Sequence, residues 1–450
     1  MYKKSLLMVS NSVSTSVLAS CIIAAIPGAA FAASFQILEQ SPAHLGKAFA
    51  GTASDISDAS SVFFNPAGIG QLDSSMITVG GNAIFAKAKF NDTNSNTGGV
   101  EGETDEIGYI PNLYWVTPIS EKLTFGLGLN APYGLASKYD DEWVGRYLAT
   151  HSELEIVNLN AVLAFDINDI FSIGVGVDYQ RAQVTLESQV DSTFGISPSA
   201  SRDSSAKIQG DDDDISADVS IYFTPSEQTS VGLVWREGGE FDLEGDAKFS
   251  LNAFCSPGAG FPTGAPPRPT TGTLCAAGLG ALQGDAQASV QLPDTLTLSG
   301  THKLGDNWRF HGDIAWTQWS NIQTINVVNS DNNLTINQLA LQYDDSMRYA
   351  VGFSYESESP WTWRFGVALD ESPQTDPALL SPRIPDQDRT WFSGGFNYEL
   401  SQSASIDFGY THIRVDEARI NNTEAQTGHH VEGSFDASVN IVAVQGNWRF

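Results

Sequence analysis

The feature that most constrains this sequence is an alternation of apolar with polar or small residues at a period of two. It recurs from about residue 74 to the last residue, and the clearest runs are 171–180, 347–356, 361–370 and 442–450. Successive side chains of a β-strand point to opposite faces. Each run therefore predicts a strand with one apolar face and one face of polar or small residues.

The aromatic residues favour a membrane barrel over a soluble sandwich of two sheets. A sandwich buries its apolar faces against each other, whereas a membrane barrel turns them to lipid. Trp361, Trp391, Tyr398 and Trp448 lie at strand ends, where membrane barrels carry their interfacial girdles. The chain also ends on Phe450, in register with the last strand, which resembles the signal read by the outer-membrane assembly machinery. We expect that machinery to be a partner.

The connections between the predicted strands alternate between short and long. Tight turns at 166–169 and 400–403 contrast with long connections at 188–206 and 250–284. Short periplasmic turns and long extracellular loops are the layout of outer-membrane barrels. The sequence therefore predicts an all-β fold, a transmembrane antiparallel β-barrel of about fourteen strands over residues 74–450. We expect a monomer that sits among outer-membrane lipid and lipopolysaccharide.

The N-terminus predicts an export signal. Lys3 and Lys4 precede an apolar stretch from Val17 to Ile26, and Ala30–Ala32 forms an A-x-A cleavage site. Residues 1–32 are therefore expected to be a signal peptide. Beyond them no apolar run approaches the roughly 18 residues that a membrane helix requires.

Cysteine content and charge narrow the possibilities further. With Cys21 inside the signal, Cys255 and Cys275 remain as a pair in an exported protein, and we expect a disulfide; two free thiols are the alternative. The formal net charge is -30, which repels phosphate backbones and excludes nucleic acid as a partner.

Residues 33–73 lack the period-two pattern and predict a hatch, or plug. Ser41-Pro42 begins a short helix that extends through Phe49 and ends at Gly51, and Asn65-Pro66-Ala67 breaks the chain again. The lumen of a fourteen-stranded barrel is too wide for side chains alone to fill. We therefore expect this segment to block the lumen.

Six segments, in order along the chain, resemble a known family. They are Ala33–Gln36, Leu45–Gly51, Asn65–Ala67, Trp316–Ser320, Asp370–Pro373 and Ile384–Arg389. Together they resemble the FadL/TodX family of outer-membrane transporters for long-chain fatty acids and other hydrophobic compounds. The resemblance implies a fourteen-stranded barrel with an N-terminal hatch. It also implies that substrate passes from a groove among extracellular loops to a pocket beside the N-terminal tail, and then leaves sideways at a kink in the third strand.

The third strand carries a candidate for that kink. The strand pattern from Leu123 to Leu129 meets Asn130-Ala131-Pro132. Proline cannot donate to a strand ladder, so a local break in pairing is expected there. The alternative is that Pro132 ends the strand at a loop.

The resemblance also implies substrate-binding residues. Arg181 resembles the position of a head-group arginine, and Phe35 that of a tail aromatic that reaches into the pocket. The alternatives are an arginine paired with acids of the lumen and ordinary packing of the plug. A second basic residue of the family falls at Asn326 here, which leaves room for less polar substrates.

Other polar clusters are assigned structural roles. Asp386, Asp388 and Arg389 are expected to hold a loop to the barrel rim by charge-assisted bonds. Asp211–Asp214 lacks the spacing of a calcium loop, and the adjacent pair His429-His430 is not a metal site by itself. We expect no metal and no cofactor.

These observations favour a passive transporter. The seven histidines are scattered and no G-x-S-x-G or G-x-x-x-x-G-K-[ST] motif occurs, so neither an enzyme nor an ATP-driven pump is expected. The predicted function is uptake of long-chain fatty acids by ligand-gated lateral diffusion through the barrel wall. Uptake of aromatic or alkane hydrocarbons is the first alternative, and a structural or adhesive barrel is the second.

Overall fold

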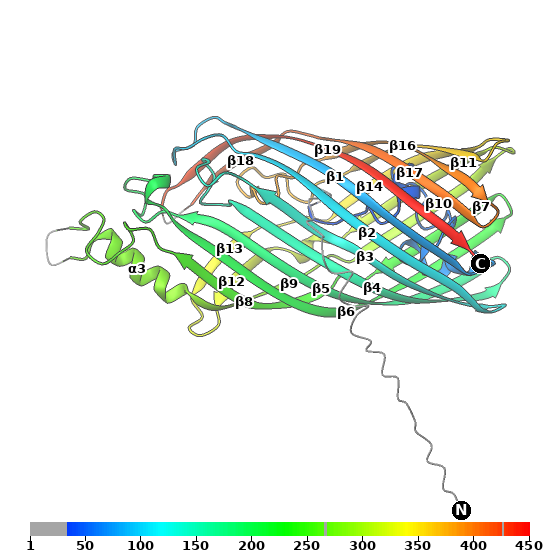
Figure 1. The fold of residues 1–450 in the computed structure, drawn as a ribbon, viewed down its shortest axis with the longest axis horizontal. Coiled ribbons are helices and arrows are strands. Elements are labelled where there is room, and N and C mark those ends of the chain that lie inside the picture. Colours follow the sequence, from blue (N-terminus) through cyan, green and yellow to red (C-terminus); the bar gives the residue numbers. More distant parts are fainter. Residues whose placement is uncertain (1–33, 265–267, 425–426) are drawn as a thin grey trace, which may run out of the picture.

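The computed structural model describes residues 34–264, 268–424 and 427–450. The predicted signal peptide, residues 1–32, lies outside the described residues. Figure 1 shows a long barrel of tilted strands, with one helical excursion beyond one end of the barrel. None of the helices in the described ranges is both long and apolar enough to cross a lipid bilayer.

The barrel wall is one antiparallel sheet that closes on itself. Within the described residues it contains nineteen β-segments, and β1 pairs with β19 from Met76↔Arg449 to Asp92↔Gly433. Five strands are each interrupted once (β7 with β8, β9 with β10, β11 with β12, β13 with β14, β17 with β18), so the segments make fourteen strands. The predicted fold class and strand number are thereby confirmed.

The strand segments are β1 (Met76–Asp92), β2 (Glu103–Ser120), β3 (Leu123–Lys138), β4 (His151–Asn168), β5 (Phe171–Val190), β6 (Ser204–Ser226), β7 (Thr229–Arg236), β8 (Glu240–Ser250), β9 (Gly284–Gln291), β10 (Thr295–Leu304), β11 (Trp308–Thr317), β12 (Thr324–Asn329), β13 (Thr335–Ala340), β14 (Ser346–Glu356), β15 (Trp361–Asp370), β16 (Arg389–Ser401), β17 (Ala404–Val415), β18 (Ala418–Thr423) and β19 (His430–Arg449). The helices are α1 (Pro42–Leu45), α2 (Ser61–Phe64), η1 (Pro66–Gln71), η2 (Ala200–Arg202), α3 (Thr271–Leu282) and η3 (Trp319–Asn321).

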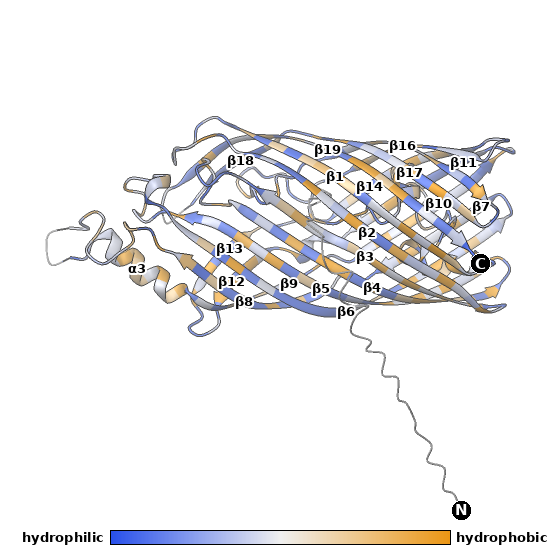
Figure 2. Ribbon diagram, viewed as in Figure 1, coloured by the Kyte–Doolittle hydropathy of each residue, from blue (hydrophilic) through white to orange (hydrophobic). Residues whose placement is uncertain are grey.

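The alternation of apolar with polar or small residues corresponds to the outer and inner faces of the wall. On β5, Ile173, Val175 and Val177 are exposed on the outside, whereas the intervening Gly174 and Gly176 are buried inside. Figure 2 shows the same alternation of hydropathy along many of the strands. An apolar outer face and a lumen of small or polar residues are what a lipid-embedded barrel requires.

The segment before β1 packs inside the barrel as a hatch, drawn in dark blue in Figure 1. Thr52 donates from its hydroxyl to Asp313 of β11 at 2.7 Å, and the backbone N–H of Ala67 donates to Ser220 of β6 at 2.8 Å. Asn65 caps η1 by accepting from Ala67 N–H at 3.0 Å. These contacts attach the hatch to two strands of the wall, β6 and β11, which are separated by β7 and β10.

The first hatch helix is shorter than predicted. Ser41 caps α1 as expected, but the helix ends at Leu45 rather than Phe49. Ala48 and Phe49 have φ values of 50° and 55°, and this left-handed backbone cannot continue an α-helix. Gly51, with φ 75°, then completes the turn.

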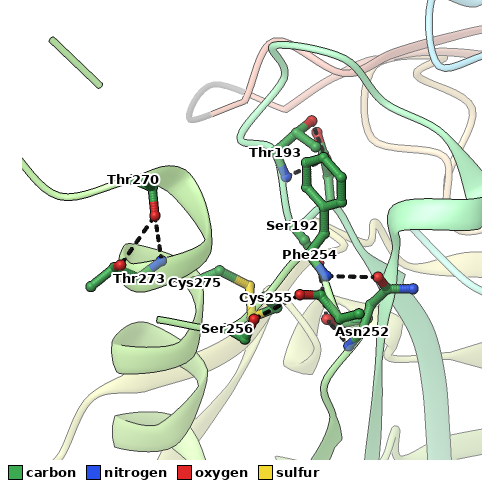
Figure 3. The surroundings of a disulfide bond; sticks show 12 residues. Ser192, Thr193, Asn252, Phe254, Cys255, Ser256, Thr270, Thr273 and Cys275 are labelled. Carbon is green, nitrogen blue, oxygen red and sulfur yellow. Dashed lines mark hydrogen bonds between the residues drawn. A yellow bond between two sulfur atoms is a disulfide. The ribbon is translucent and has the colours of Figure 1, made fainter. Parts of the chain in front are cut away.

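Cys255 and Cys275 form a disulfide in the long connection between β8 and β9. Figure 3 shows that it joins the chain before α3 to the helix itself, and that Thr270 caps the helix by accepting from Thr273 N–H at 3.3 Å. Both cysteines are buried with Leu279 in a small apolar cluster. The helical excursion therefore has its own small core.

His429 joins three of the long loops. Its Nε2 donates to Asp191 at 3.0 Å and its Nδ1 donates to Glu424 at 3.1 Å, while its ring stacks on Tyr147 with centroids 4.2 Å apart. Burial disfavours the charged imidazole, but hydrogen bonds to the two carboxylates outweigh it and raise the pKa of His429 from 6.5 to about 9. The protonated ring is required for both bonds, because a neutral imidazole has one N–H.

This arrangement predicts a loss of loop anchoring at alkaline pH. A raised pKa means that the stabilisation is fully present below pH 6.5 and is lost as pH rises through about 9. Protease cleavage within residues 191–203, normalised to the unfolded protein, should therefore accelerate between pH 7 and pH 10. The His429→Gln variant should show the faster rate at both values. A wild-type rate that is equal at pH 7 and pH 10 would contradict this role.

Candidate functional site

The third strand leaves its neighbour part-way along the wall. The β2–β3 ladder runs from Ser120↔Leu123 only to Leu113↔Leu129, although β2 reaches back to Glu103 and β3 continues to Lys138. On its other side β3 stays paired with β4, but the register shifts between Asn130 and Tyr133. The gap in the wall therefore begins at Asn130-Ala131-Pro132. The alternative that Pro132 ends the strand is wrong, because β3 continues beyond it.

The gap begins in register with the end of the apolar outer face of β5. Asn130 pairs with Asn158 of β4, which pairs with Gln180 of β5. On the outer face of β5, Tyr179 precedes this level and Arg181 follows it. An opening at this level adjoins the edge of the lipid-facing band.

The N-terminal tail, residues 34–40, takes the place of β2 along the free edge of β3. Ile37 N–H donates to Pro132 C=O at 2.8 Å, and Gly134 N–H donates to Phe35 C=O at 2.9 Å. Gln36 lies opposite Tyr133 as an antiparallel bridge. A Cβ on Gly134 would lie 2.7 Å from the end of the Ile37 side chain, so a larger residue there would displace that side chain.

Gln40 provides hydrogen-bond partners for the backbone at the kink itself, and so closes the gap between β2 and β3 there; this closure is called the seal below. Its Nε2 donates to Ala131 C=O at 2.6 Å, and its Oε1 accepts from Ala131 N–H at 3.3 Å. The same Nε2 lies 3.0 Å from Ile37 C=O. A side-chain amide thus satisfies both backbone groups of Ala131, at the point where the β2–β3 ladder breaks.

An apolar pocket lies beside the tail, between the wall and the loops. Phe35 forms part of its lining and is only 4% exposed. The Phe35 ring packs edge-on against Trp319 at 4.9 Å and lies 6.1 Å from Tyr133. The other lining residues are Leu135, Glu153, Leu154, Ile156, Ala182, Val184, Leu186, Ile208, Gln209, Gly210, Phe241, Leu243, Ala286, Gln287, Ala288, Val290, Leu292, Ile325, Val327, Leu339, Leu341, Ser381, Arg383 and Ile384.

The loop motif Asp386–Arg389 fixes the start of the tail. Asp386 Oδ2 accepts from Ser34 N–H at 2.9 Å and lies at the centre of the motif, with Arg389 Nη2 3.3 Å from its Oδ1. Asp388 accepts from Ser372 N–H at 2.9 Å. Asp386 and Arg389 thus form an ion pair, whereas Asp388 binds a backbone N–H instead, and the contact of Asp386 to the tail was not predicted from the sequence.

Arg181 does not point into the lumen, which corrects the expectation that it lies in the pocket. Its guanidinium is on the outer surface, 47% exposed, 2.7 Å from Asp211 and 3.7 Å from Asp213 of β6. The physical reason is parity: Arg181 shares the outward face of Val177, whereas the adjacent Ala182 faces the pocket. The carboxylates of Asp211–Asp214 therefore pair with this cation and with backbone N–H groups of β8.

Asn326 also lies outside the pocket. It is exposed on β12 and accepts from Gln338 at 2.7 Å, while its neighbours Ile325 and Val327 line the cavity. The substitution at this position therefore does not alter the pocket lining. Among the described residues, no group of three or more His, Cys, Asp and Glu side chains is arranged to hold a metal ion.

Sequence reasoning missed Arg383, the cation that does line the pocket. It is 3% exposed, and its Nη1 donates to Ser152 Oγ at 2.8 Å, to His151 C=O at 3.0 Å and to Glu187 C=O at 3.4 Å. Burial lowers the pKa of Arg383 to about 10, so the guanidinium stays charged at neutral pH. Its position directly before the Ile384–Arg389 segment was the available signal.

Comparison with known proteins agrees with this geometry. The sequence model of the family described as "Outer membrane protein transport protein (OMPP1/FadL/TodX)" matches residues 23–450. The chain belongs to this family. The FadL family comprises outer-membrane barrels that transport hydrophobic compounds, and the present protein is accordingly an outer-membrane transporter of that kind.

Curated relatives of this FadL-family protein extend over most of its length. It is 30% identical over 451 residues to the "47 kDa outer membrane protein" of Pasteurella multocida, covering 98% of this chain and 100% of the relative. It is 29% identical over 427 residues to the "Long-chain fatty acid transport protein" of Escherichia coli strain K12, covering 89% and 92%.

Solved structures share the same fold. A Pseudomonas aeruginosa FadL homologue superposes with a TM-score of 0.80 at 23% identity, covering 93% of this chain and all of the other. The Pseudomonas putida toluene transporter TodX superposes with a TM-score of 0.68 at 16% identity, covering 92% and 99%. At identities of 23% and 16%, these superpositions show that the fold is shared and do not identify the substrate.

Replacing Gln40 should loosen the seal in this FadL-family protein. The Gln40→Ala variant leaves the Ala131 N–H and C=O without their partner, at a cost of about 1–3 kcal/mol for each buried group. Hydrogen exchange at residues 130–134 should become about tenfold faster or more. Gln71→Ala alters a hatch glutamine whose amide donates to Ser172 of β5 instead; it is the matched control and should leave this exchange unchanged. Unchanged protection in Gln40→Ala would refute the role of Gln40.

Proposed function

We propose that this protein takes up long-chain fatty acids, holds the acyl chain in the pocket beside Phe35 and releases it sideways between β2 and β3. The observation that carries the proposal is that one segment, the tail, occupies both places. Phe35 fills part of the pocket with its side chain and pairs with the free edge of β3 through its backbone. A ligand that displaces Phe35 also removes the partner of that edge.

The energies favour a long chain as the displacing ligand. Moving Phe35 and Ile37 away from β3 breaks two backbone hydrogen bonds, at about 0.5–1.5 kcal/mol each, and exposes an aromatic side chain, at about 1.5–3 kcal/mol. Each methylene of an acyl chain that becomes buried returns about 0.8 kcal/mol. On this scale roughly four to eight buried methylenes offset the cost.

A small aromatic hydrocarbon is a weaker candidate for the same step. Toluene has the shape of the phenylalanine side chain, so exchanging the Phe35 ring for toluene leaves the buried apolar area nearly unchanged. Nothing then compensates for the broken hydrogen bonds to Pro132 and Gly134. The names of the Escherichia coli relatives support the same preference for fatty acids.

Uptake measurements test the substrate class. Labelled oleate and labelled toluene are supplied to a bacterium that lacks its own outer-membrane transporter for them, with and without this protein. We expect severalfold faster entry of oleate and no change for toluene. Faster entry of toluene alone would assign the protein to hydrocarbon uptake, and no effect on either would favour an adhesive or structural barrel.

A reversible cross-link tests the movement of the tail. Gln36 and Tyr133 form a non-hydrogen-bonded antiparallel pair, the geometry in which Cα atoms lie closest, at about 4.5 Å. The double variant Gln36→Cys, Tyr133→Cys should therefore form a disulfide that fixes the tail on β3. Oleate uptake should fall to the background rate when the pair is oxidised and recover after reduction.

The two single variants and the wild type, each with and without reductant, control for loss of Tyr133 and for reduction of the native disulfide at Cys255–Cys275. Full uptake by the oxidised double variant, with the cross-link verified by mass spectrometry, would eliminate tail displacement as a step.

A further inference from the structure

Both strands that border the gap carry a proline there, and only Pro132 of β3 belongs to the kink described above. The other is Pro111 of β2, which lies opposite Gly81 of β1. A proline has no backbone N–H, so within a sheet it is tolerated where its nitrogen faces no strand partner. The direction of the Pro111 nitrogen therefore indicates on which side β2 lacks a partner.

The nitrogen of Pro111 faces β3. Successive residues of a strand direct their backbone groups to alternate neighbours. Phe90 N–H donates to Gly102 C=O at 2.7 Å, which continues the β1–β2 register, so the even-numbered residues of β2 bond to β1. The odd-numbered residues, Pro111 among them, point to the other side, where the last such pair with β3 is Leu113↔Leu129.

The next pair of that ladder would join Pro111 to Ala131. Extending the register by two residues on each strand beyond Leu113↔Leu129 leads to this pair. A pair of this kind exchanges two hydrogen bonds, one in each direction. Pro111 can accept from Ala131 N–H, but it has no hydrogen to donate to Ala131 C=O. β2 can therefore offer Ala131 at most one of the two bonds.

Gln40 of the tail offers Ala131 both bonds. Its Nε2 donates to Ala131 C=O at 2.6 Å, and its Oε1 accepts from Ala131 N–H at 3.3 Å. Beyond the gap, at the rim, Lys138 N–H of β3 donates to the Thr104 hydroxyl of β2 at 3.2 Å. The two strands are thus held together at both ends of the gap, and between these ends Gln40 outcompetes β2 for Ala131 by one hydrogen bond.

We propose that Pro111 is a positioning residue of the exit: it ends the β2–β3 ladder one pair before Ala131 and leaves Ala131 to Gln40. At this point the wall is then closed by the tail rather than by β2, which is bound to β1 along most of its length. The end of the ladder follows from the strand geometry alone. Its consequence for uptake rests on the proposed function.

The alternative is that Pro111 only restricts the unfolded chain and so stiffens β2. Such a role would be independent of Gln40, and substitutions at the two positions would have additive effects. Competition for Ala131 instead makes the effect of one substitution depend on the other. A double-mutant cycle between Pro111 and Gln40 therefore separates the two roles.

The test measures hydrogen exchange at residues 130–134 in purified protein without ligand. In the wild-type background, Gln40→Ala should accelerate this exchange about tenfold or more, as described above. In the Pro111→Val background β2 supplies both bonds to Ala131, so Gln40→Ala should change the exchange by about twofold at most.

The matched control is Pro118→Val. Pro118 lies on the same strand in its paired part, opposite Thr124, and as an even-numbered residue it directs its nitrogen away from β3. It should leave the tenfold effect of Gln40→Ala in place. Pro111→Ala also restores the N–H and is measured in parallel, so that the cycle can be completed if Pro111→Val does not reach the folded, heat-modifiable form.

Uptake of labelled oleate tests the consequence for the exit. Pro111→Val should lower the rate about twofold to tenfold, because an additional strand pair must open before the ligand leaves. Pro118→Val should retain the wild-type rate. An unchanged rate in Pro111→Val would overturn its role in the exit.

The exchange measurements decide the ladder end separately. An equal acceleration by Gln40→Ala in the wild-type and Pro111→Val backgrounds would overturn the competition for Ala131, whatever the uptake rates are. A wild-type protein that takes up no oleate would overturn the proposed function alone, since the exchange cycle requires no ligand.

Discussion

The structure depends on one constraint: backbone N–H and C=O groups in a lipid-embedded wall must find partners within the protein. Fourteen strands meet it by closing β1 onto β19. Where β2 and β3 separate, the tail and the Gln40 amide supply the partners instead. The same hydrogen bonds therefore complete the wall and hold the proposed exit closed, and one cannot be changed without the other.

The hatch and the tail are held by different kinds of contact. Charged groups of the wall bind the hatch, since Asp313 accepts from Thr52 and Arg348 donates to Ala48. Hydrogen bonds to charged groups are worth about 1.5–3 kcal/mol each. The tail depends mainly on neutral hydrogen bonds worth about 1 kcal/mol each. A ligand can therefore move the tail while the hatch stays in place.

Local pattern was enough to predict the wall, because period two, turn length and the proline at Pro132 are properties of neighbouring residues. The pocket cation was not predictable in that way. Arg181 was assigned inward by resemblance, against an alternation that places it on the face of Val177. Arg383 reaches the pocket only because its loop packs over β3, where Ser137 and Tyr139 donate to the carbonyls of Arg383 and Pro382. Contacts between residues so far apart in the sequence produce no local periodicity, so the position of Arg383 could not be predicted from a sequence pattern.

The level of the gap has a consequence for where transport ends. The β2–β3 ladder stops beside the edge of the apolar band rather than at the periplasmic turns. By the proposed route, a fatty acid would therefore be released into the outer leaflet, still on the far side of the bilayer from the cell. The remaining passage then belongs to the lipid itself, and its rate is set by partitioning, by transfer between leaflets and by how quickly the cell consumes the acid. Compounds too polar to dissolve in the leaflet would gain nothing from entering the pocket.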